Sequence, residues 1–438
     1  MQHLLRVEAV TFYYFAQIIK SMMNSLLINN ISSLEMVLPK EKLQLKGEEM
    51  ANYKSIEQSY LLIENGKIAA YGKQSDAPER ADKVIDASGK FVLPGWCDSH
   101  THLVFAASRE TEFIDKIKGL SYEEIAANGG GILNSAKRLS NATEDELFNS
   151  ALYRLSEISA TGTTSVEIKS GYGLSVDAEL KMLRVIKRLK ENTTLNIKAT
   201  FLGAHAFPES YKNNRDGYVQ LIIDEMIPKV ADEGLADFID VFCDKGFFTP
   251  AQTAKIFEAG IKHNLIPKLH ANELGETGGI EVGVAYGARS VDHLEHTSAE
   301  HIELLKQSNT TPTLLPSTAF FLRLPYAPAR KMIDAGLGVA LATDYNPGSS
   351  PSGNMPFVLS LACIYMRMLP KEAIAAATIN GAFAMGLEQS CGSISIGKRA
   401  DILITKPIEN IAVLPYYFGS NYVETVISNG NIISQNKE

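Results

Sequence analysis

The sequence of 438 residues has little cysteine, one tryptophan and no excess of positive charge. Its four cysteines, Cys97, Cys243, Cys363 and Cys391, lie far apart and form no C-x-x-C pair. This spacing suggests neither a disulfide framework nor a cysteine-based zinc site. Lysine and arginine number 42 against 50 aspartates and glutamates, a net charge of −8, which disfavours polyanionic partners. We predict a globular protein of the reducing cytoplasm that binds neither nucleic acid nor membranes.

The sequence also lacks a run long enough to span a bilayer. Residues 9–19 are uncharged and rich in aromatic residues, but a span needs about 20 apolar residues. This stretch has no clear small-residue cleavage site either. Because Met22 and Met23 stand just before a strand-like segment, we expect residues 1–22 to be an extension outside the fold. We favour an upstream start codon over a signal peptide as its origin.

Short β runs with turn signals occupy both ends of the chain. Residues 60–64 and 67–71 flank Asn65-Gly66, a dipeptide that indicates a tight hairpin when apolar runs surround it. The C-terminal end of the chain repeats this pattern. Because β segments from opposite ends of a chain can pair, we expect residues 23–91 and 388–438 to form one small composite β-sandwich domain.

Between these ends, strand-like runs alternate with helical ones, and the runs are almost continuously apolar, as in strands covered on both faces. The eight runs are residues 91–98, 163–169, 197–202, 238–242, 266–270, 290–294, 311–315 and 338–344. Capping-box patterns at Ser121, Thr143 and Thr249 mark helix starts between them. Eight strands close a barrel, so we predict an α/β fold with a (β/α)8 TIM-like barrel over residues 92–387.

Histidines and carboxylates stand at the ends of four of these runs: His100 and His102, then His270, His293 and Asp344. The carboxyl ends of barrel strands meet at one face, where active sites lie. Two histidines at positions i and i+2 of an extended segment point to the same side and can reach one ion. A third histidine and a carboxylate complete a nitrogen and oxygen set suited to Zn²⁺, with Fe²⁺ or Mn²⁺ as alternatives.

The segment from Pro94 to His102, PGWCDSHTH, resembles the metal-dependent amidohydrolase superfamily when taken together with His270, His293 and Asp344. That superfamily joins a barrel to a β domain built from both termini. Further stretches resemble one branch of it, which hydrolyses a small cyclic amide bearing a propionate. They are residues 167–173, 201–205, 240–243, 270–273 and 342–349. Ser349 stands where we expect threonine in that branch, which keeps a hydroxyl.

The resemblance implies one divalent metal ion, Zn²⁺ or Fe²⁺, held by His100, His102, His270 and Asp344. It also implies three catalytic roles. Asp344 takes a proton from the attacking water, and His293 donates a hydrogen bond where negative charge develops. Glu273, three residues after His270, carries a proton to the departing nitrogen.

For the substrate, the resemblance implies a cation for the propionate, and Arg109 matches it, because its planar fork can bind both carboxylate oxygens. The alternative for Arg109 is a surface ion pair with Glu110 or Glu112. The other implied substrate contacts are Tyr172, His205, Glu273, Asn346, Gly348 and Ser349. Relatives are often homodimers, and we expect the same here.

Lys169 invites a second interpretation, because binuclear relatives bridge two metals with a carboxylated lysine. Those lysines follow strand four, whereas Lys169 ends strand two, so we expect a single metal. We expect Lys169 to be a buried partner of Glu167 or to support the metal ligands without binding the metal. The glycines of residues 128–131 follow no strand and match no phosphate-binding loop, so we expect a mobile loop near the barrel mouth.

Two alternatives for the function stay open at this point. An aminohydrolase acting on a nucleobase-like heterocycle would use the same metal set, but it has no general need for Arg109 or the loop of Tyr172. A non-enzymatic scaffold is the other alternative, and the complete set of ligand-type residues argues against it.

Overall fold

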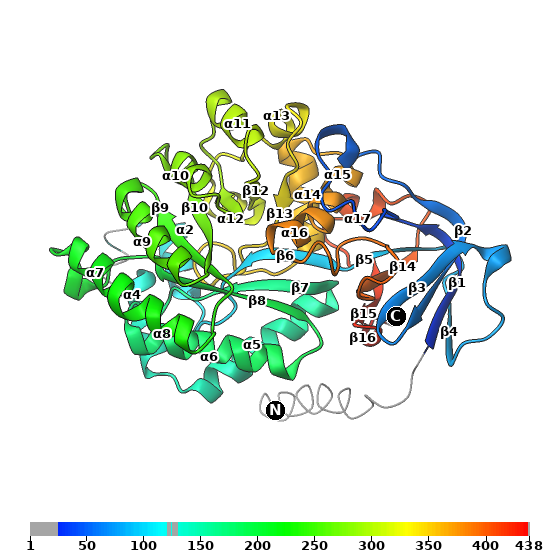
Figure 1. Cartoon of the computed structure of the whole chain (residues 1–438), viewed down its shortest axis with the longest axis horizontal. Helices are drawn as coiled ribbons and strands as arrows, with labels where there is room; N and C mark the ends of the chain where they lie inside the picture. The colour runs from blue at the N-terminus through cyan, green and yellow to red at the C-terminus, as the bar shows by residue number, and fades with distance from the viewer. Residues whose placement is uncertain (1–24, 121–123, 125–129, 437–438) are drawn as a thin grey trace.

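The computed structural model describes residues 25–120, 124 and 130–436. These form a barrel and a sheet built from both ends of the chain, which lie side by side in Figure 1. The expectations for residues 1–22 and for the capping box at Ser121 lie outside the described residues, and so does most of the glycine loop at 128–131. In the part described, no helix is long and apolar enough to cross a membrane.

The barrel consists of eight parallel strands that pair in chain order. They are β6 (Trp96–Thr101), β7 (Thr163–Lys169), β8 (Asn196–Ala204), β9 (Phe238–Cys243), β10 (Ile266–Ala271), β11 (Ser290–His293), β12 (Thr311–Leu314) and β13 (Ala340–Leu341). A parallel bridge between Thr101 and Tyr345 joins the last strand region to the first, and the backbone N–H of His102 donates to the Tyr345 carbonyl at 2.9 Å. The predicted α/β barrel is confirmed.

The first predicted strand, residues 91–98, is wrong as one element. The chain forms β5 (Lys90–Pro94) in the terminal sheet and β6 in the barrel, with Gly95 between them. A Cβ on Gly95 would lie 2.1 Å from Oγ1 of Thr164, so only glycine fits where the chain passes from one sheet to the other. Both segments are apolar and extended, and the pattern alone therefore could not separate them.

The predicted eighth strand, residues 338–344, is shortened to β13. Beyond it, the backbone N–H of Asp344 still donates to the carbonyl of His100 at 2.9 Å. The φ of Asp344 is +52°, which takes it out of the β region. The backbone at Asp344 thus stays bonded to β6 while its conformation departs from a strand.

Helices surround the barrel and cover its strands (Figure 1). They are α2 (Glu110–Ile117), α4 (Gly131–Asn141), α5 (Glu144–Ala160), α6 (Val176–Asn192), α7 (Arg215–Leu221), α8 (Ile227–Asp232), α9 (Pro250–Lys262), α10 (Gly279–Ala285), α11 (Ala299–Lys306), α12 (Pro316–Leu322), α13 (Ala329–Asp334), α14 (Met355–Met366), α15 (Pro370–Ala376), α16 (Ile379–Ala384) and α17 (Val413–Tyr416). The capping boxes at Thr143 and Thr249 are confirmed, each hydroxyl accepting from the third helical N–H.

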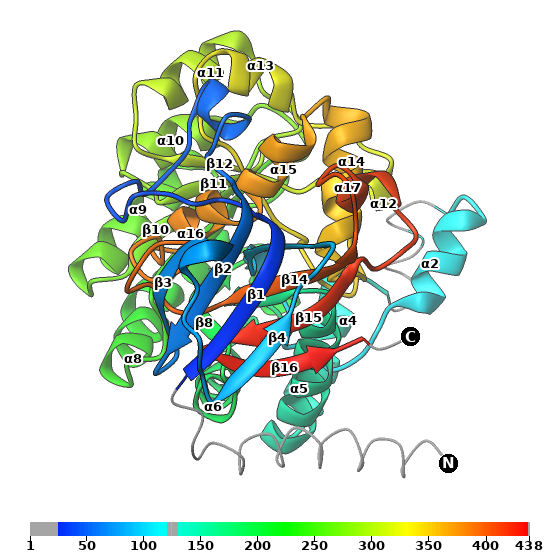
Figure 2. The same cartoon turned by 90° about the vertical axis from the view of Figure 1, so that its right-hand side faces the viewer.

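The second sheet combines strands from both ends of the chain (Figure 2). They are β1 (Ser25–Leu34), β2 (Ile56–Glu64), β3 (Lys67–Lys73), β4 (Lys83–Asp86), β5, β14 (Ile402–Pro407), β15 (Val423–Ser428) and β16 (Asn431–Gln435). The two halves join where β14 pairs antiparallel with β5. Aliphatic side chains of both halves, such as Ile28 of β1 and Ile402 of β14, share one buried core. The composite β domain is therefore confirmed.

Candidate metal centre

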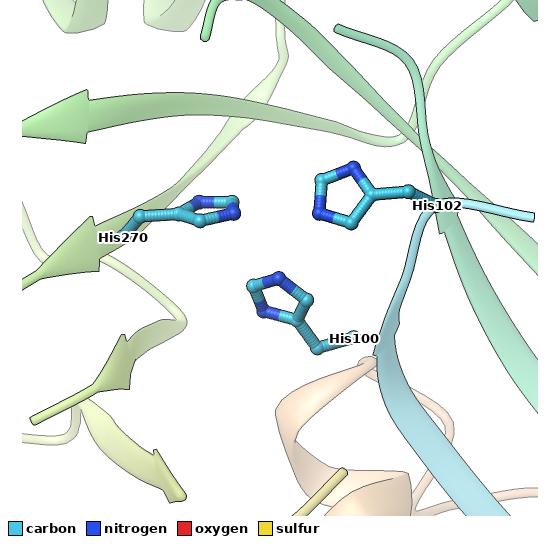
Figure 3. A group of neighbouring side chains, drawn as sticks. All are labelled: His100, His102 and His270. Carbon is cyan, nitrogen blue, oxygen red and sulfur yellow. The ribbon is translucent and has the colours of Figure 1, made fainter. Parts of the chain in front are cut away.

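Three histidines converge at the carboxyl ends of the barrel strands. His100 lies in β6, His102 directly follows it, and His270 lies in β10 on the facing side of the barrel (Figure 3). One ring nitrogen of each lies within 4.8 Å of the others, and all three side chains are buried. The i and i+2 spacing on an extended segment directs both β6 histidines to the same side, as predicted.

Asp344 completes the cluster from the end of the last strand. Its Oδ1 lies 3.5 Å from Nε2 of His100 and 3.5 Å from Nε2 of His102. Its Oδ2 accepts a hydrogen bond of 2.6 Å from the hydroxyl of Thr318 in α12. One carboxylate oxygen is therefore held by the protein, and the other faces the histidines.

Two buried carboxylates orient two of the three rings. Nδ1 of His100 lies 2.7 Å from Oδ2 of Asp292, and Nδ1 of His270 lies 3.0 Å from Oδ1 of Asp240. Because an ionised carboxylate only accepts hydrogen bonds, each Nδ1 carries the proton and each Nε2 has a free lone pair. Within the described part of the chain, Nδ1 of His102 has no such partner, so this orientation applies to two of the three rings.

The residues present fit a divalent metal ion. Nε2 of His100 and Nε2 of His270 are buried and have no hydrogen-bond partner among the described residues. A buried acceptor without a partner costs free energy that a bound cation would recover. Three imidazole nitrogens and one carboxylate oxygen form a donor set typical of zinc or iron sites, and carboxylates behind the histidines are a recurring feature of such sites.

His293, at the end of β11, lies beside this cluster between two glutamates. Its Nε2 is 3.7 Å from Oε2 of Glu273, and its Nδ1 is 3.8 Å from Oε1 of Glu295. Burial opposes charging of the ring, but the two glutamates outweigh it and raise the pKa of His293 to about 10. Its φ of +84° is left-handed, a conformation that costs free energy and is common at functional sites.

Glu273 is buried in the same region. Burial is the main cause that raises the pKa of its carboxyl to about 7. Its backbone N–H and that of Leu274 both donate to Oδ2 of Asp244, at 2.8 and 2.9 Å, which fixes the loop after β10. The side chain is thereby held near His293 as a group that can exchange protons near neutral pH.

Tyr172 and His205 line the site on the side of His102. The rings of His205 and His102 are stacked with centroids 5.2 Å apart, and the Tyr172 ring lies 5.8 Å from that of His102. Nδ1 of His205 lies 3.0 Å from the carbonyl of Gly171, whose φ of +110° favours glycine. A Cβ at Gly171 would lie 2.8 Å from that nitrogen, so the glycine allows the ring its place.

Arg109 precedes α2 and packs against the turn that follows Asp344. A Cβ on Gly348 would lie 2.3 Å from Nη1 of Arg109. Nε of Arg109 donates to Oε2 of Glu112 at 2.9 Å, so the ion pair that the sequence left as an alternative is present. Burial tends to raise the pKa of Glu112, but its hydrogen bond to Arg109 prevails and the pKa is lowered. Arg109 therefore forms the ion pair with Glu112 and lies beside Gly348 at the same time.

Asn346, Gly348 and Ser349 form a compact turn directly after Asp344. Oδ1 of Asn346 accepts from the backbone N–H groups of Gly348 and Ser349, both at 2.8 Å. Nδ2 of Asn346 donates to the carbonyl of Asp344 at 2.7 Å and to the Ser349 hydroxyl at 2.8 Å. The groups expected to contact the substrate are therefore engaged with one another, and they shape the loop that carries Asp344.

Sequence reasoning missed three groups that hold the ligands in place, Asp240, Asp292 and Thr318, and it also missed the buried Lys268, which pairs with Glu167. A signal for three of them was available, because Asp240, Lys268 and Asp292 are charged residues inside otherwise apolar barrel strands and are buried. A buried charge of this kind is retained only where it is paired or coordinates a metal. Thr318 gave no comparable signal, since threonine is common in helices near their first turn.

The fold and the site together define the class of metal-dependent hydrolases. The barrel is joined to a β domain built from both termini, and the cluster suited to a metal lies at the carboxyl ends of its strands. Residues 91–433 match the amidohydrolase family, and the chain belongs to that family. Within it, the chain belongs with the imidazolonepropionases. It is 54% identical to the imidazolonepropionase of Flavobacterium johnsoniae over 408 residues, which is 93% of this chain and 99% of the relative. The imidazolonepropionase of a Geobacillus species is 43% identical, covering 94% and 98% of the two chains.

Solved structures of other enzymes share the fold. An adenosine deaminase from Xanthomonas campestris with bound zinc superposes with a TM-score of 0.66 at 17% identity, over 93% of this chain and 92% of that one. The atrazine chlorohydrolase of Arthrobacter aurescens, complexed with zinc, gives a TM-score of 0.65 at 18% identity, over 94% and 95%. At these identities the likeness concerns the fold alone.

Proposed function

We propose that the chain hydrolyses the cyclic amide of 4-imidazolone-5-propanoate to N-formimidoyl-L-glutamate, a step of histidine degradation (EC 3.5.2.7). Its membership of the imidazolonepropionases supports this reaction. The observation that carries the assignment to this site is the position of Arg109. Its guanidinium lies against Gly348 in the turn that follows Asp344, which supports its use as the cation for the propionate.

We propose that one divalent ion, Zn²⁺ or Fe²⁺, is held by His100, His102, His270 and Asp344. When bound, such an ion acidifies a water molecule and polarises the amide carbonyl. The tautomers set by Asp240 and Asp292 keep the Nε2 lone pairs of His270 and His100 available for it.

The remaining chemistry falls to groups of this chain. Asp344 accepts the proton of the attacking water, and Thr318 holds its Oδ2. His293, protonated near neutral pH because of its neighbouring glutamates, donates a hydrogen bond to the oxygen on which negative charge develops. Glu273 carries the proton to the departing ring nitrogen, for which a pKa near 7 is suited.

The substrate is held at both of its ends. Arg109 binds the propionate, with Glu112 orienting the guanidinium. The ring contacts Tyr172 and His205, which line the site beside His102. Asn346, Gly348 and Ser349 contact the substrate from the turn after Asp344, and the backbone N–H of Gly348 exchanges its bond to Asn346 for one to the substrate.

The test supplies imidazolone propanoate freshly made by enzymatic hydration of urocanate and follows the loss of its ultraviolet absorbance. Activity should disappear after treatment with a chelator and return when Zn²⁺ or Fe²⁺ is added. Metal analysis should find one ion per chain, and the preferred ion is the one that restores the larger rate. No turnover by the metal-loaded protein, together with ammonia release from a nucleobase, would replace this proposal with a deaminase.

We also propose a cytoplasmic homodimer. Large apolar side chains are exposed on adjacent helices, among them Ile364 and Tyr365 of α14 and Phe320 of α12. Exposed groups of this kind mark association surfaces when they lie together. Light scattering coupled to size-exclusion chromatography should give twice the chain mass of 47.9 kDa, and a monomer would contradict the proposal.

A further inference from the structure

A group of five buried charged side chains lies in the barrel beneath the metal-ligating cluster. Its members are Glu167 and Lys169 of β7, Asp240 of β9, Lys268 of β10 and Asp292 of β11. Neither lysine has a role in the proposed reaction. A buried ammonium is expensive unless carboxylates surround it, so each lysine must be explained by its partners.

Lys169 contacts three carboxylates at once. Its Nζ lies 2.7 Å from Oε1 of Glu167, 2.7 Å from Oδ2 of Asp240 and 3.5 Å from Oδ2 of Asp292. All four side chains have no exposed surface. Two of these partners, Asp240 and Asp292, are the carboxylates that accept from Nδ1 of His270 and His100.

We propose that Lys169 is a positioning residue that ties together the two carboxylates behind His100 and His270, and so holds both Nε2 atoms toward one metal ion. One aspartate on each side joins Lys169 to a histidine. Asp240 uses Oδ2 for Lys169 and Oδ1 for His270, while Oδ2 of Asp292 serves both Lys169 and His100. The inference rests on the proposed metal site.

The physical reason is that one ammonium contacts both aspartates. Nζ of Lys169 lies 2.7 Å from Oδ2 of Asp240 and 3.5 Å from Oδ2 of Asp292, and these carboxylates lie against Nδ1 of His270 and His100. Without the ammonium, each carboxylate loses a partner and can turn away from its histidine. The ring can then rotate or change tautomer.

The same contacts bear on metal number. An ammonium that donates to carboxylates on two sides has no free lone pair with which to bind carbon dioxide, so it does not form a carboxylated bridge. This agrees with a site for one ion.

Lys268 provides a matched control within the same group. It is equally buried, and its Nζ bonds Oε2 of Glu167, the carbonyl of Ser99 at 3.1 Å and the carbonyl of Ala384 at 3.5 Å. It therefore pairs with Glu167 rather than with the carboxylates behind the histidines. Removing either lysine leaves a buried carboxylate short of a partner, but only removal of Lys169 affects Asp240 and Asp292.

The test compares Lys169→Met with Lys268→Met as full-length, metal-depleted proteins. Zn²⁺ is titrated in competition with a chromophoric chelator, and the visible spectrum is recorded after loading with Co²⁺. The Lys169 variant should bind Zn²⁺ about 10- to 100-fold more weakly, the usual effect of removing a group behind a ligand, and its Co²⁺ bands should shift. The Lys268 variant should lose thermal stability yet keep the affinity and the spectrum of the unchanged protein.

Three results would overturn the proposal: unchanged affinity in the Lys169 variant, tighter binding in it, or equal losses in both variants. If Lys169→Met does not fold, the double variant Lys169→Met/Glu167→Gln removes one charge of each sign, and the same loss of affinity is expected. An unchanged protein that binds no Zn²⁺ would instead refute the metal site itself, so the two failures are distinguishable.

Discussion

The hydroxyl of Thr318 donates a 2.6 Å hydrogen bond to Oδ2 of Asp344, and both side chains are buried. This bond leaves Oδ1 of Asp344 facing His100 and His102. A residue of α12, far from any motif, thus determines which carboxylate oxygen of Asp344 faces the histidines.

Replacing Thr318 with valine should keep the volume and remove this bond. We expect kcat to fall about tenfold or more, since a hydrogen bond to a charged group contributes about 1.5–3 kcal/mol. Thr318→Ser, which restores a hydroxyl, should recover most of the rate. Steady-state kinetics with metal-loaded protein check this, and a valine variant with normal kcat would contradict it.

Replacing Asp344 with asparagine removes the proposed base and the proposed carboxylate ligand while keeping the shape of the side chain. Turnover should fall by about 10²- to 10⁴-fold, the range for loss of a proton-transfer group. Circular dichroism and the melting temperature should show a folded protein, because Thr318 can still donate to the amide oxygen. A kcat close to that of the unchanged protein would refute the role of Asp344.

Replacing Arg109 with methionine should raise KM about tenfold or more and change kcat little, because a charge-assisted bond to the propionate is lost. Arg109 and Arg138 both line one surface pocket, and Arg138 is exposed, so Arg138→Met removes an equal charge without removing the proposed contact. The control should leave KM unchanged. If KM rose equally in both variants, the effect would come from the overall charge and not from a contact with Arg109.

Replacing Gly348 with alanine should place a methyl group 2.3 Å from Nη1 of Arg109. The end of an arginine side chain can move aside, so we expect the fold to survive and the guanidinium to shift. KM should rise roughly fivefold, equivalent to ~1 kcal/mol of binding free energy. Kinetics and the melting temperature test this together, and a large loss of stability without a change in KM would show that Gly348 has only a structural role.

The carboxyl of Glu273 should make stability depend on pH. Burial raises its pKa to about 7 in the folded chain, whereas the ordinary value is 4.5. The folded state therefore holds this proton more tightly than the unfolded state does. Its contribution to stability is complete below pH 4.5 and is lost as pH rises through about 7. Thermal unfolding of metal-depleted protein should show Glu273→Gln gaining stability relative to the unchanged chain over that interval, and parallel curves would contradict this.

Much of the fold could be predicted because it follows from local patterns. Thr143 and Thr249 form the capping boxes that their sequences indicate, and residues 163–169 form the predicted strand with the same bounds. Local hydrogen-bonding and periodicity rules suffice for such elements. At Gly95 they do not suffice, because both sides of this glycine are extended and apolar and only the partner strands show that two sheets are involved.

For the site, the sequence by itself determined which side chains could bind a metal. His100 and His102 share a face through their spacing, and His270 and Asp344 stand at the ends of strands that must meet at one side of a closed barrel. Only the tertiary structure decided how these groups are held. Asp240, Asp292 and Lys169 come from three separate strands, and Thr318 comes from a helix. Their bonds to the ligands and to one another depend on the closure of the barrel, which no local pattern encodes.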